Sequence, residues 1–308
     1  MPRVAVAVPT FRRPRGLERL LGALAQLETT ADVEIVVADN DAASHEGADL
    51  CEKLAPNYRW SLTSIVVKER GIAQARNALV DHILAYSDAD FVAMLDDDEW
   101  PSAEWLDAFL RVQRETQADA LRGTILREFE SVPGPWAAQL QGIAPVRQRS
   151  GLIDMIDGAG NVMIARRCFE GLAKPYFDPA FALTGGEDRD FFTRLQQRGL
   201  CFAWADEAVC TEFVPASRAN LDWALKRAYR IGNSDMRVFL KYAPAFSARM
   251  REGVKIAGAI LLYPILQLAF APLPARRAEP LCKLYRAWGK IAAIFGRYYN
   301  EYAAVHGG

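Results

Sequence analysis

Short apolar runs alternate with segments of helical periodicity along the first hundred residues. The runs are rich in valine, isoleucine and alanine, which is typical of strands buried in a parallel sheet. Between them, apolar side chains recur every three or four residues, as on one face of a helix. This alternation predicts an α/β fold with a doubly wound sheet and helices on both of its faces. The predicted strands are 4–8, 33–38, 64–67 and 91–95, and the predicted helices are 17–24, 47–54 and 72–86.

The pattern is less regular in the next hundred residues. We expect strands at 118–129, 153–165 and 201–209, and a helix at 191–198. Residues 130–151 are rich in proline and glycine and predict a loop or a loosely ordered lid. Polar clusters follow the first, second and fourth strands, and open α/β sheets bind their ligands at such carboxyl ends. The sequence therefore predicts a binding site at this edge of the sheet.

A second part of the chain begins near residue 215, where the sequence becomes basic and helical in pattern. We therefore expect an α/β domain at 1–215 and a helical region at 216–308. Residues 256–273 carry no charge, contain Pro264 and reach only the lower length limit of a membrane span. Basic residues on both sides of this segment, together with its proline, favour a helix or a re-entrant pair that lies in a membrane interface. A last helix, 281–302, mixes basic and aromatic residues and suits an anionic lipid surface, although a bundle packed on the first domain or on a second subunit has the same pattern.

Composition narrows the classes of protein to consider. With 51% hydrophobic and 24% charged residues the chain is expected to fold, and a net charge of -1 argues against nucleic acid as a partner. Five cysteines without a C-x-x-C pair are typical of reduced thiols. The presence of only three histidines argues against catalysis by histidine and against a zinc site. The first apolar run ends at Pro9 without a cleavage pattern, so we interpret it as a buried strand and expect the site in the cytoplasm.

Four acidic side chains follow the fourth predicted strand directly, at Asp96, Asp97, Asp98 and Glu99. Adjacent carboxylates repel one another and call for a compensating cation. Mg²⁺ and Mn²⁺ prefer carboxylate oxygens and often bridge to substrate phosphates. Because alternate side chains of an extended segment point the same way, Asp96 and Asp98 can serve one metal site. The alternative is an acidic turn that caps a helix beginning near Pro101.

The order of these motifs over residues 4–215 resembles family 2 glycosyltransferases of the GT-A fold. The resemblance rests on the opening strand and loop, the end of the second strand, a helix start, the D-x-D motif and a later acidic motif. These are residues 4–14, 36–40, 69–77, 96–98 and 185–190. Within the family, the chain is most similar to bacterial exopolysaccharide glycosyltransferases of the succinoglycan type. Residues 95–101, 160–162, 183–188 and 204–209 carry this second resemblance.

The resemblance implies a nucleotide-sugar donor and a Mn²⁺ or Mg²⁺ cofactor. Asp39 at the end of the second strand would bind the donor base, which favours a UDP-sugar, and Asp96 would lie on the ribose side. Asp98 would ligate the metal. Glu212 would complete the coordination, or equally lie at the surface or beside the acceptor, because a histidine that many family members carry near this segment is absent. The full donor-binding set is Pro9, Thr10, Arg12, Asp39, Arg70, Arg76, Asp96 and Asp97.

The later acidic motif supplies the general base in the family. Asp188 is our choice for that base, with Glu187 as the second catalytic candidate and Asp190 as a further one. Gly185 and Gly186 would let the backbone approach the sugar closely. The alternative is that these acids cap the helix that follows. A single base without a carboxylate nucleophile fits direct attack with inversion. On the basic helix beyond the core, Arg227 and Arg230 are candidates to assist the diphosphate, or else contact lipid headgroups.

Together these features predict transfer of a sugar to a polyprenyl-diphosphate-linked saccharide in surface polysaccharide assembly. The expected location is the cytoplasmic face of the bacterial inner membrane, as a peripheral or monotopic protein, with a homo-oligomer as a further option. Two alternatives keep the fold, namely a polyprenyl-phosphate glycosyltransferase and an inactive scaffold that binds nucleotide-sugar. A nucleotidyltransferase is disfavoured because the loop after the first strand lacks the usual glycines.

Overall fold

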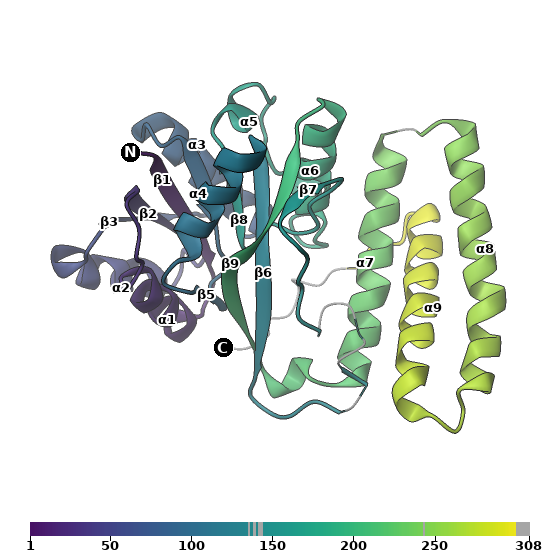
Figure 1. Ribbon diagram of the computed structural model, residues 1–308. Helices are drawn as coiled ribbons and strands as arrows, with labels where there is room; N and C mark the ends of the chain where they lie inside the picture. Colours follow the sequence, from purple (N-terminus) through teal and green to yellow (C-terminus); the bar gives the residue numbers. More distant parts are fainter. Residues whose placement is uncertain (135, 138–139, 141–143, 243, 300–308) are drawn as a thin grey trace.

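A computed structural model describes residues 1–134, 136–137, 140, 144–242 and 244–299 (Figure 1). Its described residues form one nine-stranded mixed sheet in the order β3-β2-β1-β4-β8-β6-β9-β5, with β7 paired to β9. The first four strands are parallel where they pair, and β8 joins β4 and β6 in antiparallel fashion. The strands are β1 Arg3–Thr10, β2 Asp32–Asp39, β3 Ser61–Val66, β4 Phe91–Met94, β5 Glu99–Pro101, β6 Ala120–Phe129, β7 Gly151–Ile153, β8 Val162–Ala165 and β9 Phe202–Val214.

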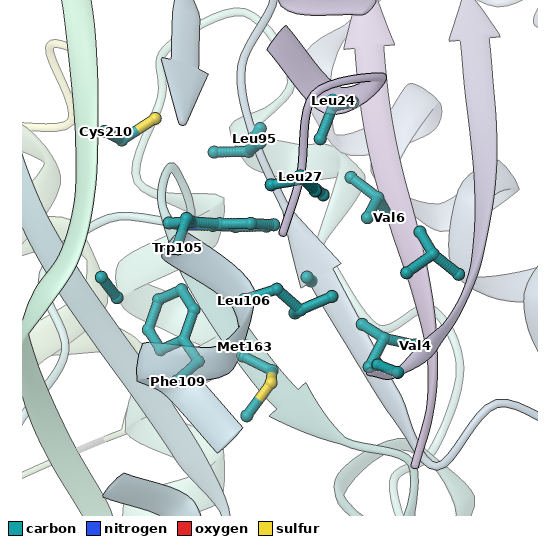
Figure 2. Close-up of a cluster of buried hydrophobic side chains, with 14 of the residues drawn as sticks. Val4, Val6, Leu24, Leu27, Leu95, Trp105, Leu106, Phe109, Met163 and Cys210 are labelled. Carbon is teal, nitrogen blue, oxygen red and sulfur yellow. The ribbon is translucent and has the colours of Figure 1, made fainter. Parts of the chain in front are cut away.

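Helices cover both faces of the sheet, as the alternating pattern predicts. In the central strand β1, Val4, Val6 and Val8 pack on one face, and Ala5 and Ala7 pack on the other. The first face is covered by α1 Pro14–Leu24, α2 Glu46–Leu54 and α4 Trp105–Thr116. Figure 2 shows part of this cluster, where side chains of α4 meet the sheet. The second face is covered by α3 Ile72–Tyr86, α5 Arg167–Glu170 and α6 Glu187–Gln197.

The C-terminal region forms three long helices, α7 Leu221–Lys241, α8 Phe246–Ala269 and α9 Pro274–Ile294. Helix α9 lies between α7 and α8, and α7 lies nearest the sheet (Figure 1). Gly232 of α7 and Gly289 of α9 meet the backbone of the facing helix, so that a side chain at either position would collide with it. Helix α8 is long and apolar enough to cross a membrane by length and composition, and only 6% of its most apolar window is buried. The predicted domain boundary at residue 215 stays a prediction.

The predicted α/β class is confirmed, and most departures lie in the second hundred residues. The predicted strand 153–165 is wrong in its middle, where β7 ends at Ile153 and β8 begins at Val162. Gly158 and Asn161 both have positive φ there, which interrupts an extended chain. The strand predicted at 201–209 continues to Val214 as β9.

Helix boundaries also shift. The helix predicted at 191–198 begins four residues earlier, at Glu187, so that part of the acidic motif lies inside α6. The last helix is α9, which ends at Ile294, and residues 300–302 of the prediction lie outside the described residues. In the predicted loop 130–151, residues 135, 138–139 and 141–143 also lie outside them. Short 3-10 turns at Ala55–Asn57, Pro179–Phe181 and Ala216–Arg218 complete the described elements.

Candidate active site

A cavity of about 560 Å³ opens at the carboxyl ends of β1 and β4. This is the edge at which an open α/β sheet binds ligands. The sheet side supplies residues that follow β1 and β4, the start of α3, the start of α6, and β6. Helices α7 and α9 supply the opposite wall. The cavity therefore combines the α/β domain with the C-terminal helices.

Asp97 fixes the loop after β1. Its carboxylate accepts hydrogen bonds from the Thr10 hydroxyl at 2.9 Å, the Phe11 amide at 3.3 Å and the Arg13 guanidinium at 2.8 Å. The side chain is buried, and burial raises the pKa of Asp97 to about 6, although Arg13 acts in the opposite direction. These contacts hold the predicted donor-binding loop in place.

Asp96 and Asp98 both line the cavity, and each pairs with arginine. Arg76 donates to Asp96 at 2.9 Å, and Arg13 donates to Asp98 at 2.9 Å, with Arg218 at 3.4 Å. Within the ranges that the structure describes, no group of three histidine, cysteine or acidic residues is arranged to hold a metal ion. A metal site at Asp98 therefore stays a prediction. The alternative of a helix cap near Pro101 is wrong, because that residue ends β5 and α4 begins at Trp105.

Glu99 and Glu212 lie opposite each other in the β5–β9 pair. Glu212 lines the cavity and forms an ion pair with Arg127 of β6. Glu99 is buried, and one of its carboxylate oxygens accepts a hydrogen bond from the Asp96 amide at 3.0 Å. Burial, followed by the charge of Asp96, raises the pKa of Glu99 to about 8. Glu212 thus already has a cationic partner, and its predicted metal role stays a prediction.

Arg76 joins the two acidic motifs. Its guanidinium donates to Asp96 and, at 2.5 Å, to Glu187 in the first turn of α6. Arg76 and Glu187 are both buried, and burial together with the charge of Asp188 raises the pKa of Glu187 to about 7. This gives Glu187 a bridging role between α3 and α6, while its predicted catalytic role stays a prediction.

Asp188 is half-buried in the first turn of α6 and lines the cavity. Gly186 precedes the helix with φ of 102°, and an added side chain there would press on Ser234 of α7. The hydroxyl of Ser234 donates to the Gly185 carbonyl at 3.1 Å, so α7 holds the glycine turn from outside. The alternative of an acidic N-cap is wrong, because Gly186 occupies the N-cap and the acids lie inside the first turn of α6.

Asp190 has a different environment from Asp188. It is fully buried, and it accepts hydrogen bonds from Lys241 at 2.6 Å and from the Tyr242 hydroxyl at 2.7 Å. It does not line the cavity. Asp190 therefore ties α6 to the end of α7, and the structure does not place it as a base.

The predicted donor-binding residues divide into two groups. Pro9, Thr10 and Arg70 line the cavity, and the Arg70 guanidinium lies 4.8 Å from the ring centre of Phe11. Asp39 does not line it. Its two oxygens accept hydrogen bonds from the amides of Asp41 and Ala48, each at 3.0 Å, and its contact with the donor base stays a prediction.

Arg12 also points away from this cavity. It has φ of 55° and donates to Asp41 at 2.7 Å. Hydrogen bonds from Arg12 and Ser44 lower the pKa of Asp41 to about 2. Arg12 borders a neighbouring cavity instead, on the other side of Asp97 and Asp98, and its role at the donor stays a prediction.

Several cavity residues were not among the predicted ones. Arg13 contacts two carboxylates of the acidic tip and lies within the motif after β1, so the sequence contained its signal. Arg122 and Arg127 of β6 line the cavity as well, with Arg218 and Arg286 from farther along the chain. No recognised motif contains these four, and only the fold brings them to the acidic tip.

A sheet with this strand order, with a D-x-D motif at the end of β4 and an acidic turn opposite it, defines a GT-A-type transferase. The model of glycosyl transferase family 2 matches residues 5–169, and the chain belongs to that family. It is a glycosyltransferase with the GT-A fold.

Two curated relatives come from Rhizobium meliloti. The chain is 31% identical over 259 residues to succinoglycan biosynthesis protein ExoM, which covers 83% of this chain and 81% of that protein. It is 32% identical over 115 residues to succinoglycan biosynthesis protein ExoW, which covers 37% of this chain and 35% of that one.

Two solved structures share the fold. A mannosyltransferase from Pyrobaculum calidifontis, in complex with GDP-Man and Mn²⁺, has a TM-score of 0.65 at 18% identity, over 96% of this chain and 88% of that one. TarS 1–349 of S. aureus, in complex with UDP, has a TM-score of 0.52 at 13% identity, over 97% of this chain and 93% of that one.

Proposed function

We propose that the protein moves a sugar, with inversion, from a nucleotide-sugar to a polyprenyl-diphosphate-linked saccharide in exopolysaccharide assembly. The observation that carries the proposal is that Asp98, after β4, and Asp188, in α6, line the same cavity. The relative ExoM, named for succinoglycan biosynthesis, supports the pathway. UDP in the TarS structure supports the UDP-sugar donor, and GDP-Man in the mannosyltransferase supports a nucleotide-sugar in general.

The cavity carboxylates fit a Mn²⁺ or Mg²⁺ cofactor. Asp96 and Asp98 offer oxygen donors toward the cavity, and such ions are often held by one or two carboxylates together with substrate phosphates. A cluster of three protein carboxylates is therefore not required. In this proposal Asp98 holds the ion, with Glu212 as the second candidate ligand. A bound ion neutralises the charge that develops on the departing diphosphate.

The chain's own residues would carry out the remaining steps. Asp188 accepts the proton of the acceptor hydroxyl as that oxygen attacks the anomeric carbon opposite the diphosphate. Attack from that side inverts the configuration. Arg76 holds the loop of Asp188 against α3 through Glu187, and α7 holds it through Ser234. The base is thereby fixed from two directions.

Two substitutions test this assignment. Asp98→Ala should remove Mn²⁺-dependent donor binding and lower transfer about 10³-fold or more, since charge stabilisation contributes several kcal/mol. Asp188→Asn should leave UDP affinity unchanged and lower kcat about 10²- to 10⁴-fold. Asp88→Asn, on an exposed side chain that pairs with Arg3, is the matched control. Undiminished transfer by Asp188→Asn would refute the proposed base. Polyprenyl phosphate, offered as acceptor in place of the diphosphate-linked saccharide, tests the alternative of a polyprenyl-phosphate glycosyltransferase. Transfer to polyprenyl phosphate would favour that alternative.

The C-terminal helices support a location at the membrane. We propose that residues 216–308 attach the 1–215 domain to the cytoplasmic face of the inner membrane as a peripheral or monotopic protein. Along α8, Phe246, Met250, Val254, Leu261, Ile265 and Leu268 are exposed on one face of the helix. Basic residues flank this apolar face, at Arg249, Arg251 and Lys255 in α8 and at Arg276, Arg277 and Lys283 in α9. Such a surface suits an anionic interface.

A further inference from the structure

We propose that Arg122, Arg127 and Arg227 form an anion subsite that binds a phosphate group carried by the acceptor. The subsite lies in the cavity described above, between β6 and α7. The inference rests on the proposed function in one respect, namely that donor and acceptor share this cavity. It adds a recognition element for the acceptor, on which the motifs of the sequence give no information.

The arrangement coincides with an irregularity in the pairing of β6 with β9, where residues 206–208 of β9 have no register partner in β6. Side chains of a regular strand alternate between faces, so residues 122 and 127 would point to opposite sides. The register between β6 and β9 shifts between Gly123 and Thr124, and both Arg122 and Arg127 line the cavity. From the other wall, α7 presents residues 223, 227, 230, 231 and 234, which follow one face of the helix. Arg227 belongs to this face.

The two guanidinium groups on the β6 side have hydrogen-bond donors without partners. The Arg127 side chain is 3% exposed and pairs with Glu212. Among the residues that the structure describes, no carboxylate forms an ion pair with Arg122, whose nearest ring is that of Trp204 at 5.9 Å. The Nε atoms of Arg122 and Arg127 are buried without a hydrogen-bond partner within the described part of the chain. Buried donors of this kind call for a partner, which a bound anion can supply.

Burial and the positive charge of a neighbouring arginine also act on these guanidinium groups. Burial lowers the pKa of Arg122 and lowers that of Arg127 to about 10, and the nearby Arg227 adds to the effect on Arg127. Neighbouring guanidinium groups repel each other until an anion joins them. Guanidinium groups bind phosphate through paired hydrogen bonds, so a phosphate satisfies both the charge and the open donors.

The position of Arg122 assigns the anion to the acceptor. Asp157 and Asp188 are the carboxylates that act most on Arg122, and Asp188 is the proposed base. The acceptor hydroxyl has to reach that base, so a group bound at Arg122 lies beside the acceptor. The donor diphosphate is expected at the acidic tip of β4, where Arg13 and Arg218 contact Asp98.

Calorimetric titration of the full chain tests the subsite with two probes, inorganic phosphate and farnesyl phosphate, in the presence of UDP and Mn²⁺. Arg122→Met should weaken phosphate binding at least about tenfold, which corresponds to about 1.4 kcal/mol. It should leave the Kd of UDP within about twofold. Arg122→Lys keeps the charge but loses the paired hydrogen-bond geometry. Its phosphate affinity should lie between those of wild type and Arg122→Met. Arg111→Met, on an exposed side chain of α4, is the control and should change neither the phosphate affinity nor the UDP affinity.

The outcomes separate the possible roles. Equal loss of UDP and phosphate affinity would assign Arg122 to the donor site, and unchanged phosphate affinity would mean that no subsite exists. Either result overturns the inference, and Arg122→Lys provides the same comparison if Arg122→Met does not fold. Tighter binding of farnesyl phosphate than of inorganic phosphate would support a lipid-linked source, and equal binding would support a phosphate group alone. Failure of the wild-type chain to bind UDP with Mn²⁺ would instead count against the proposed function, and phosphate titration without UDP still tests the subsite.

Discussion

The two walls of the cavity are built in different ways. The wall at the ends of β1 and β4 consists of acids held by arginines at short sequence distance from recognisable motifs. The wall of β6, α7 and α9 contains five arginines that three separate elements bring together, namely Arg122, Arg127, Arg227, Arg230 and Arg286. In the proposed function, the first wall holds the metal ion and the donor. In the proposed function the second wall contacts the acceptor, and its residues come from β6 beside the shifted β6–β9 register and from helices outside the sheet.

The wall at the ends of β1 and β4, the acidic wall, buries several carboxylates at a cost in free energy. Arginines of the same wall offset this cost. Glu99, Glu187 and Asp97 are all buried, and burial raises the pKa of each. Arg76 and Arg13 supply the compensating charges. Loss of Arg76 from the acidic wall should therefore destabilise the fold, whereas loss of Arg122, which forms no ion pair among the described residues, should affect mainly ligand binding.

The largest expected effect comes from Arg76→Met. This change leaves Asp96 and Glu187 without their shared buried cation. Removal of one partner of a buried ion pair typically costs about 3–5 kcal/mol of the free energy of unfolding. Urea unfolding at pH 8 should show a loss of this size. Arg111→Met breaks an exposed pair with Glu207 and should change stability by about 0.5 kcal/mol or less.

A second substitution identifies the cause. In Arg76→Met/Glu187→Gln the buried charge on α6 is removed together with its partner, and most of the lost stability should return. A double variant as unstable as Arg76→Met alone would show that packing of the arginine, rather than charge, is what α3 and α6 require.

Glu99 makes the stability of the acidic wall depend on pH. Its pKa is about 8 in the folded chain against an ordinary value of 4.5, so the folded state holds a proton that the unfolded state has lost between these pH values. The free energy of unfolding therefore falls as pH rises through this window. From pH 6 to pH 8, wild type should lose at least about 2 kcal/mol relative to Glu99→Gln.

The measurement is urea unfolding in EDTA, so that bound metal does not contribute. Glu128→Gln serves as the control, because Glu128 also lies in a strand but is exposed. Parallel pH profiles for wild type and Glu99→Gln would contradict the prediction and would mean that Glu99 is ionised in the folded chain.

The first wall could be predicted from the sequence because strand ends concentrate function in short motifs. Asp98 and Asp188 belong to such motifs and both line the cavity, while their roles in metal binding and catalysis stay predictions. The sequence does not reveal how deeply each acid is buried. Asp188 is half-buried and lines the cavity, whereas Asp190, two residues later, is fully buried away from it. Asp39 likewise ends β2 as predicted, but its oxygens are taken up by backbone amides.

The second wall could not be predicted from motifs. Whether Arg122 and Arg127 share a face depends on the shifted register at Gly123 and Thr124, which arises from pairing with distant β9. Helix α7 has a mixed pattern because one side packs on α9 while another lines the cavity. Periodicity identifies such a helix but does not say what each face contacts. The same limit applies to α8, whose apolar face requires a direct test.

Leu261→Gln provides that test and has the smallest expected effect. Leu261 is 71% exposed on the apolar face of α8, so its loss should leave folding and UDP affinity unchanged. If that face enters a bilayer, the loss of one buried leucine should cost about 2 kcal/mol, or roughly a 30-fold weaker binding to vesicles that contain phosphatidylglycerol. Leu152→Gln on β7, at 67% exposure, is the matched control and should bind vesicles as wild type does. Equal vesicle binding by both variants and wild type would refute membrane attachment through α8. A change in oligomeric state of Leu261→Gln alone, without any change in vesicle binding, would show instead that α8 faces a second copy of the chain.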